Sequence, residues 1–186
     1  MQLVPRGRFG VPFQWFDSCA STQRMLDGAV EGAVVAADEQ TAGRGRLGRA
    51  WEAPKGAGLL FSIVLTSRVE PGRLPELTVV AAEAVCAAIS LETGLSASVK
   101  PPNDVLVGGR KVAGILAEAA GGRVVLGVGV NVSQSAVQLP EDTRLPATSL
   151  ALEGAAVERG ELLATILEQL EQRYDRWLNA SVSTDT

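Results

Sequence analysis

The 186-residue sequence contains no histidine. Nucleophilic catalysis by a serine–histidine or cysteine–histidine pair is therefore excluded. Histidine ligands to zinc are excluded too, and the two cysteines, Cys19 and Cys86, cannot supply a site of four thiolates. Any chemistry must come from lysine, arginine, carboxylate or backbone groups, or from a metal ion that a substrate brings.

Basic charge and disulfide-forming cysteines are also scarce. The formal net charge is −4, so no overall positive field draws the chain to nucleic acid or to an anionic membrane. Two cysteines make no disulfide framework, and neither a signal peptide nor a membrane-length apolar run is visible. We therefore expect a cytoplasmic protein whose partners include neither nucleic acid nor a membrane.

Against this background, residues 40–49 stand out because they contain three arginines and three glycines, directly after the apolar run 33–37. Arginine carries a permanent charge and donates bidentate hydrogen bonds to carboxylates and phosphates. Glycine lets the backbone approach a ligand closely. The segment therefore predicts a loop that captures a small anion.

Three known templates resemble this loop. Gly43, Gly45 and Gly48 fit the dinucleotide-binding pattern G-x-G-x-x-G, but the proline and two glycines that follow disfavour the helix this pattern must open. The phosphate-loop pattern fails because Arg49 and Ala50 stand where lysine and a hydroxyl residue are needed. A short Arg-Gly tract for RNA is a third alternative, and a solvated loop without a role is the fourth.

A second polar motif, residues 100–104, reads Lys-Pro-Pro-Asn-Asp and follows a strand-like segment. Prolines cannot continue a strand ladder, so Lys100 is expected at a rigid strand end, where its ammonium can neutralise a carboxylate or a phosphoryl group. An ordinary turn is the alternative. In residues 127–131 glycines interrupt a strand pattern, which often marks a close approach to a ligand.

Short apolar runs separated by glycine and proline alternate with two longer helical patterns. This order predicts an α+β fold with a mixed, largely antiparallel sheet and flanking helices. Residues 1–12 are expected to be disordered (Leu3 to Gly7 resembles a protease-site linker), residues 13–178 to form one domain, and residues 179–186 to be a frayed tail. The predicted strands are 13–16, 33–38, 59–65, 98–100, 105–107, 111–119 and 124–132, and the predicted helices are 22–29, 74–92 and 162–177.

Taken together, these motifs resemble the catalytic domain of biotin protein ligases, that is, biotin–[acetyl-CoA-carboxylase] ligases. The resemblance covers residues 13–178 and implies a fold similar to class II aminoacyl-tRNA synthetase cores and lipoate ligases. The motifs are Ser21-Thr22, Gln40 to Arg49, Lys100 with Pro102-Asn103-Asp104, Lys111 to Leu116, Gly127 to Asn131, and Ala147 to Leu150.

The resemblance implies an enzyme that converts biotin and MgATP into biotinyl-5′-AMP and pyrophosphate. The biotin would then pass to a lysine of a biotin carboxyl carrier protein. Lys100 and Arg46 would be catalytic, and Mg²⁺ would enter with ATP, with Asp104 as a candidate protein ligand. The implied biotin-binding residues are Ser21, Thr22, Gln40, Gly43, Arg44, Gly45, Arg46, Lys100 and Gly114, and the implied nucleotide-binding residues are Arg49, Trp51, Asn103, Lys111 and Asn131.

The sequence departs from the family pattern at several places. Pro101 stands where the family commonly has tryptophan, and Gln23 where it has asparagine. We expect neither an N-terminal DNA-binding domain nor a C-terminal barrel domain. A lipoate or octanoate transferase of the same fold and a non-catalytic biotin or biotinyl-AMP binding protein remain alternatives, and an exposed sheet edge makes a homodimer reasonable.

Overall fold

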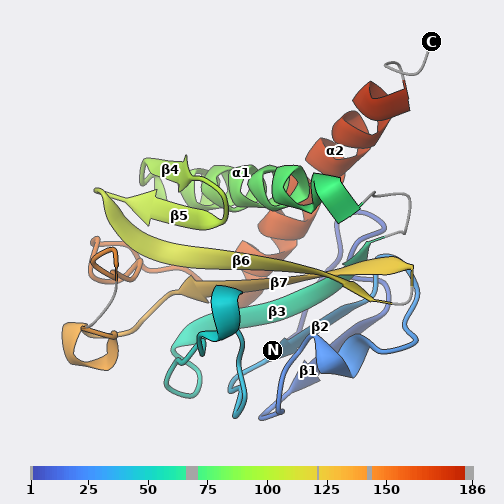
Figure 1. The fold of residues 1–186 in the computed structure, drawn as a ribbon. Coiled ribbons are helices and arrows are strands. Elements are labelled where there is room, and N and C mark those ends of the chain that lie inside the picture. Colours follow the sequence, from blue (N-terminus) through green and yellow to red (C-terminus); the bar gives the residue numbers. More distant parts are fainter. Residues whose placement is uncertain (1, 66–70, 121, 142–143, 183–186) are drawn as a thin grey trace.

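The computed structural model describes residues 2–65, 71–120, 122–141 and 144–182 (Figure 1). Its centre is a seven-stranded sheet of order β1-β2-β3-β7-β6-β5-β4, in which β1 and β2 are parallel and every other pair is antiparallel. The predicted α+β class with a mixed, largely antiparallel sheet is therefore confirmed. The strands are β1 Phe13–Phe16, β2 Val34–Ala37, β3 Gly58–Leu65, β4 Ala97–Lys100, β5 Asp104–Val107, β6 Arg110–Ala120 and β7 Arg123–Asn131.

Two long helices complete the core, α1 (Leu74–Thr93) and α2 (Arg159–Val182). Figure 1 shows α1 running beside β5 and β6, with α2 crossing behind it. By length and composition alone α1 could cross a membrane, yet one of its faces, which includes Leu77, Val85 and Ile89, is buried in the same core as β3, β6 and β7. Burial of these side chains is the main force that holds the helices on the sheet.

Four short 3₁₀ turns lie in the connections: η1 (Arg24–Leu26), η2 (Arg46–Gly48), η3 (Pro71–Arg73) and η4 (Ala136–Gln138). The helix predicted over 22–29 is wrong, because only η1 forms there. The backbone carbonyl of Ser21 accepts a hydrogen bond from the Arg24 amide, and Gly28, at φ +74°, turns the chain away. The segment is thus a tight turn that sets residues 21–23 against the sheet.

The first residues differ from the prediction of disorder over 2–12. Phe9 is 1% exposed, and its ring packs against that of Tyr174 in α2. Arg8 forms ion pairs with Glu171 and Asp175, and this guanidinium lowers the pKa of Asp175. An aromatic side chain and matched charges on α2 therefore hold a segment whose composition alone is typical of disorder.

The other end also differs from its prediction. Helix α2 continues to Val182, so the tail predicted from residue 179 is helical over 179–182. The remaining predicted tail, residues 183–186, lies outside the described residues.

Candidate functional site

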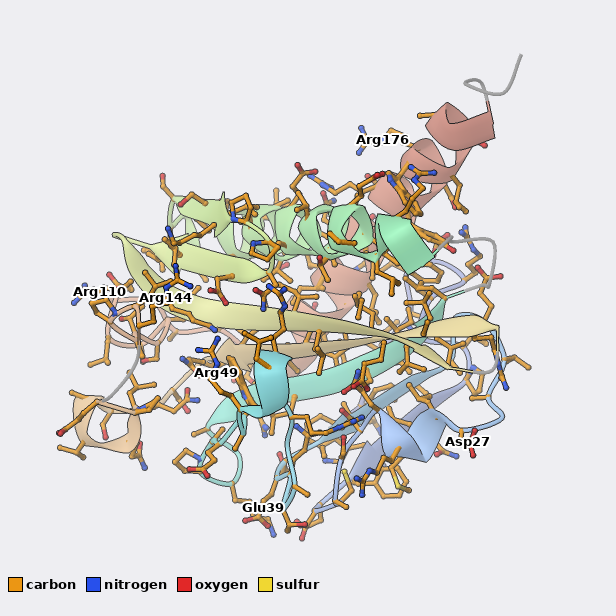
Figure 2. All side chains as sticks on the ribbon, in the orientation of Figure 1. Asp27, Glu39, Arg49, Arg110, Arg144 and Arg176 are labelled. Carbon is orange, nitrogen blue, oxygen red and sulfur yellow. The ribbon has the colours of Figure 1, made fainter. Side chains whose placement is uncertain are left out.

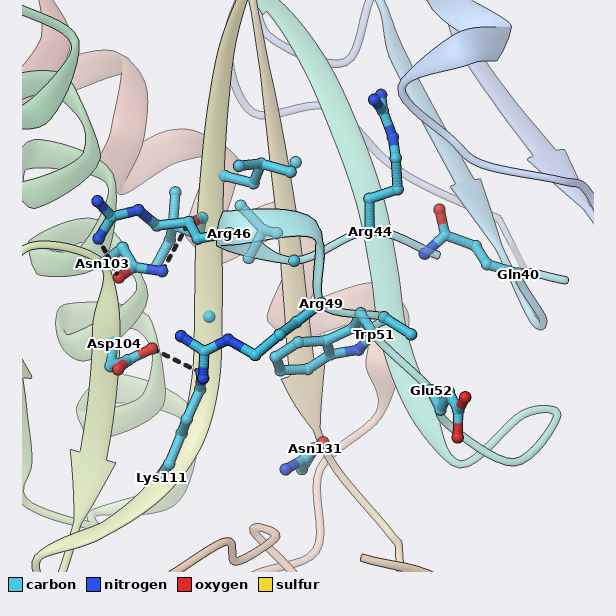
Figure 3. Close-up of a pocket in the computed structure, with 18 of the residues that line it drawn as sticks. Gln40, Arg44, Arg46, Arg49, Trp51, Glu52, Asn103, Asp104, Lys111 and Asn131 are labelled. Atoms are coloured by element: carbon cyan, nitrogen blue, oxygen red, sulfur yellow. Dashed lines mark hydrogen bonds and ion pairs between the residues drawn. The ribbon is translucent and has the colours of Figure 1, made fainter. Parts of the chain in front are cut away.

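A pocket of about 180 Å³ opens where the segment containing η2 crosses the middle of the sheet (Figure 3). Its walls come from β3, β5, β6 and β7, from η2 and its flanks, and from Pro140, Leu145 and Ala147. The fold therefore brings motifs from across the chain to one place. Twelve of the predicted site residues line it: Thr22, Gln40, Arg44, Gly45, Arg46, Arg49, Trp51, Asn103, Asp104, Lys111, Gly114 and Asn131.

One end of the pocket is cationic. Arg46 Nη1 donates to Asn103 Oδ1 at 3.0 Å, which joins η2 to the turn before β5. Lys111 Nζ of β6 lies 2.6 Å from Asp104 Oδ1 of β5, and Arg49 lies beside η2 (Figure 2). Arg46, Arg49 and Lys111 thus gather at this end, and of the three Lys111 is paired with the carboxylate of Asp104, which leaves positive charge available for an anion.

The indole of Trp51 covers the sheet next to these cations. A Cβ on Gly129 would lie 2.4 Å from Trp51 Cε2, and a Cβ on Gly114 would lie 2.8 Å from Cζ3. Both glycines are therefore required by the approach of an aromatic side chain, a reason that the strand pattern by itself does not reveal. Lys111 Nζ lies 5.5 Å from the indole centroid, and Trp51 Nε1 is buried without a hydrogen-bond partner in the described part of the chain.

The other end is lined by hydroxyl and amide groups. The Thr22 amide and hydroxyl both donate to Gln40 Oε1, at 2.8 and 3.1 Å. The Thr22 hydroxyl is also 2.7 Å from that of Ser62, a fully buried residue of β3. Sequence reasoning missed Ser62, although a polar residue inside the apolar run 59–65 was the available signal.

Three predicted site residues do not line the pocket in the described structure. Ser21 is buried beside Thr22, and the carbonyl of Gly43 accepts a hydrogen bond from the Trp51 amide at 3.0 Å. Lys100 is exposed at the end of β4, in register opposite Asp104. Its catalytic role, like the other individual roles, stays a prediction.

Sequence reasoning also left Gln23, Glu52 and Leu116 out of the site, and all three line the pocket. The cysteines do not line it, and burial raises the pKa of the Cys86 thiol to about 11, so no thiolate forms there near neutral pH. No group of three His, Cys, Asp or Glu side chains within the described residues could hold a metal ion. The pocket offers cations, amides, hydroxyls and the carboxylates of Glu52 and Asp104.

Comparison with known proteins identifies this arrangement. The model of the biotin/lipoate A/B protein ligase family matches residues 15–135. The chain belongs to this family. Among curated relatives, the biotin–[acetyl-CoA-carboxylase] ligase of Mycobacterium tuberculosis is 42% identical over 168 residues, covering 85% of this chain and 60% of that protein. The bifunctional ligase/repressor BirA of Bacillus subtilis is 36% identical over 171 residues, covering 86% and 53%.

This family member thus spans about half the length of the curated relatives it matches. Among solved structures, the biotin protein ligase from Aquifex aeolicus in complex with biotin and ATP superposes with a TM-score of 0.80. It is 32% identical, and the match covers 89% of this chain and 71% of that one. The neighbouring folds are those of biotin protein ligases, as the sequence motifs imply.

Gly43 offers a direct test of how the Gly-Arg loop is anchored. A Cβ at this position would lie 2.3 Å from the backbone oxygen of Trp51, so Gly43→Ala must displace the strand-like pairing that joins 43 to 51. We expect ligand affinity to fall by about tenfold or more, because loop misplacement of about 1 Å is costly at such sites. Isothermal calorimetry with biotin, beside a melting curve, measures both effects.

The matched control is Gly45→Ala in the same loop, where the nearest heavy atom to a Cβ, Arg49 O, is 3.4 Å away. Its effect on affinity should be clearly smaller. Equal losses in the two variants would show that any side chain in the loop is harmful, and would refute the anchoring role of Gly43.

Proposed function

We propose that the chain binds biotin and MgATP, forms biotinyl-5′-AMP, and transfers the biotinyl group to a lysine of a biotin carboxyl carrier domain. The observation that carries this proposal is the two-ended pocket, with hydroxyls and amides at one end and cations at the other. Membership of the biotin/lipoate ligase family supports it, as does the likeness to an Aquifex aeolicus ligase that binds biotin and ATP.

The polar end suits the ring of biotin. A ureido group presents one carbonyl acceptor and two N–H donors, and the pocket presents both kinds of partner through Thr22, Gln40 and Ser62. The carboxylate at the far end of the valeryl chain would then reach Arg46. Chemical complementarity thus assigns the biotin ring to the polar end of the pocket and the biotin carboxylate to the cationic end.

The cationic end suits ATP. Arg49 and Lys111 would offset the charge of the phosphates, and the Trp51 indole would pack against the adenine. Asn131, whose side-chain amide donates to the Thr148 carbonyl at 2.9 Å, is held firmly at the end of β7. Because two anions must meet here, their repulsion is the main barrier that these cations lower.

The chemistry that follows requires positioning more than proton transfer. A biotin carboxylate oxygen attacks the α-phosphorus of ATP, the bond to the pyrophosphate oxygen breaks, and pyrophosphate leaves. In the second step the neutral lysine amine attacks the biotinyl carbonyl, loses a proton to solvent, and AMP leaves. Neither step needs a histidine.

Mg²⁺ would enter with ATP as part of the substrate. Magnesium at such sites is bound by phosphate oxygens, water and one or two carboxylates, and Asp104 and Glu52 are carboxylates that line the pocket. Asp104 fits as a ligand because it already lies among the groups assigned to the phosphates. The acceptor domain, the cytoplasmic location and a homodimer are parts of the same proposal.

One assay tests the function directly. Wild-type protein mixed with biotin and MgATP should release pyrophosphate, and biotinyl-AMP should appear by mass spectrometry. The same assay with lipoate in place of biotin tests the lipoate alternative, which belongs to the same family. Binding of biotin in a calorimeter without pyrophosphate release would favour the non-catalytic binding protein and refute the ligase.

A further inference from the structure

A second cavity, of about 300 Å³, lies directly beyond the hydroxyl end of the pocket. Its lining includes the apolar Leu26, Val64 and Val125 and the charged Arg24 and Arg123. Within the described structure none of these five lines the first pocket. The second cavity is therefore a separate space, which is lined in part by η1 and lies next to the first pocket.

Among the described residues, two line both spaces, Gln23 and Arg44. Arg44 is exposed, and its Nη2 lies 2.7 Å from Glu118 Oε2 in an ion pair. Gln23, in contrast, is buried, with an exposed fraction of 9%. Gln23 and the ion-paired Arg44 thus lie where the two spaces meet.

Packing holds the Gln23 side chain in place more than hydrogen bonds do. A Cβ on Gly127 would lie 3.1 Å from Gln23 Cδ, so the side chain lies flat on the backbone of β7. Its amide donates to the carbonyls of Leu116 and Val125 only at 3.4 and 3.5 Å, which is long for such bonds. Packing on the strand backbone, rather than strong hydrogen bonding, therefore fixes the place of the Gln23 side chain.

We propose that Gln23 determines the size of substrate that the pocket accepts, by blocking access from the ring end into the second cavity. This inference rests on the proposed function, which places the ring beside Thr22, the residue next to Gln23. Shortening Gln23 joins the two cavities. The joined space then admits a biotin-like carboxylate whose ring carries an extra alkyl group, which would pack on Leu26, Val64 and Val125.

The test compares biotin with two analogues, each carrying an n-propyl group on one of the two ureido nitrogens. Selectivity is the ratio of kcat/KM for biotin to kcat/KM for the analogue in pyrophosphate release. Gln23→Ala should lower this ratio by about tenfold or more for at least one analogue, as expected when a hydrophobic site gains room for a few carbons. Gln23→Asn, which is one methylene shorter and keeps the amide, should give an intermediate ratio even if the alanine variant folds poorly.

Two controls separate bulk from other effects. Gln23→Met keeps the length without the amide and should keep the wild-type ratio, and Arg24→Ala, which alters only the second cavity, should keep it as well. An unchanged ratio in both shortened variants, or loss of selectivity in Gln23→Met, would overturn the inference. Failure of wild-type protein to release pyrophosphate with biotin would instead overturn the proposed function.

Discussion

Replacement of Lys100 by alanine is expected to slow biotinyl-AMP formation by more than about 100-fold, the loss that follows when a charged transition-state contact is removed. Lys100 ends β4 next to two prolines, and its backbone lies opposite Asp104, whose carboxylate lines the pocket. A lysine at this strand end can extend toward the phosphates once they are bound. Single-turnover formation of the adenylate measures the effect on chemistry alone.

The same variant should keep its fold, because Lys100 is exposed and a surface lysine contributes little to stability. Its melting temperature should therefore match that of the wild type. Lys100→Arg is the control: it keeps the charge but changes the geometry, and should recover part of the rate. Turnover of Lys100→Ala near the wild-type level would refute the catalytic role and leave the motif as a turn.

The second large effect is expected at Lys111. Its ion pair with Asp104 is partly buried, with side-chain exposures of 26% and 21%. Lys111→Ala removes a cation from the phosphate end and also leaves the Asp104 carboxylate unpaired, facing anions. We expect ATP affinity to weaken by about 30-fold, which corresponds to about 2 kcal/mol, the low end for truncating one partner of a buried pair.

A double-mutant cycle with Asp104→Asn separates the two contributions. If the unpaired carboxylate causes much of the loss, the double variant should bind ATP more tightly than Lys111→Ala alone. ATP binding by calorimetry with and without Mg²⁺ also shows whether Asp104 assists the metal. Additive losses in the double variant would show that the pair is not coupled and that Asp104 acts independently.

Much of the fold could be predicted because local patterns and tertiary packing agree. Residues 59–65 and 111–119 are apolar runs that β3 and β6 bury, and the period of apolar residues in 74–92 matches the buried face of α1. The helix predicted over 22–29 failed because a segment of eight residues has little helical stability of its own, and Gly28, at φ +74°, ends the turn. The disorder of 2–12 failed because its partner, α2, is more than 140 residues away in sequence.

The sequence by itself determined the chemical types at the site: cations and glycines in residues 40–49, a lysine at a strand end, and no histidine. These follow from composition and local spacing, which are properties of the chain. Only the tertiary structure decided which groups meet. Trp51 lies on Gly114 and Gly129, Ser62 touches Thr22, and Gln23 separates two cavities because strands far apart in sequence pair in one sheet. Such contacts depend on register and on the direction in which each side chain points, and a linear pattern encodes neither for residues that pair across the fold.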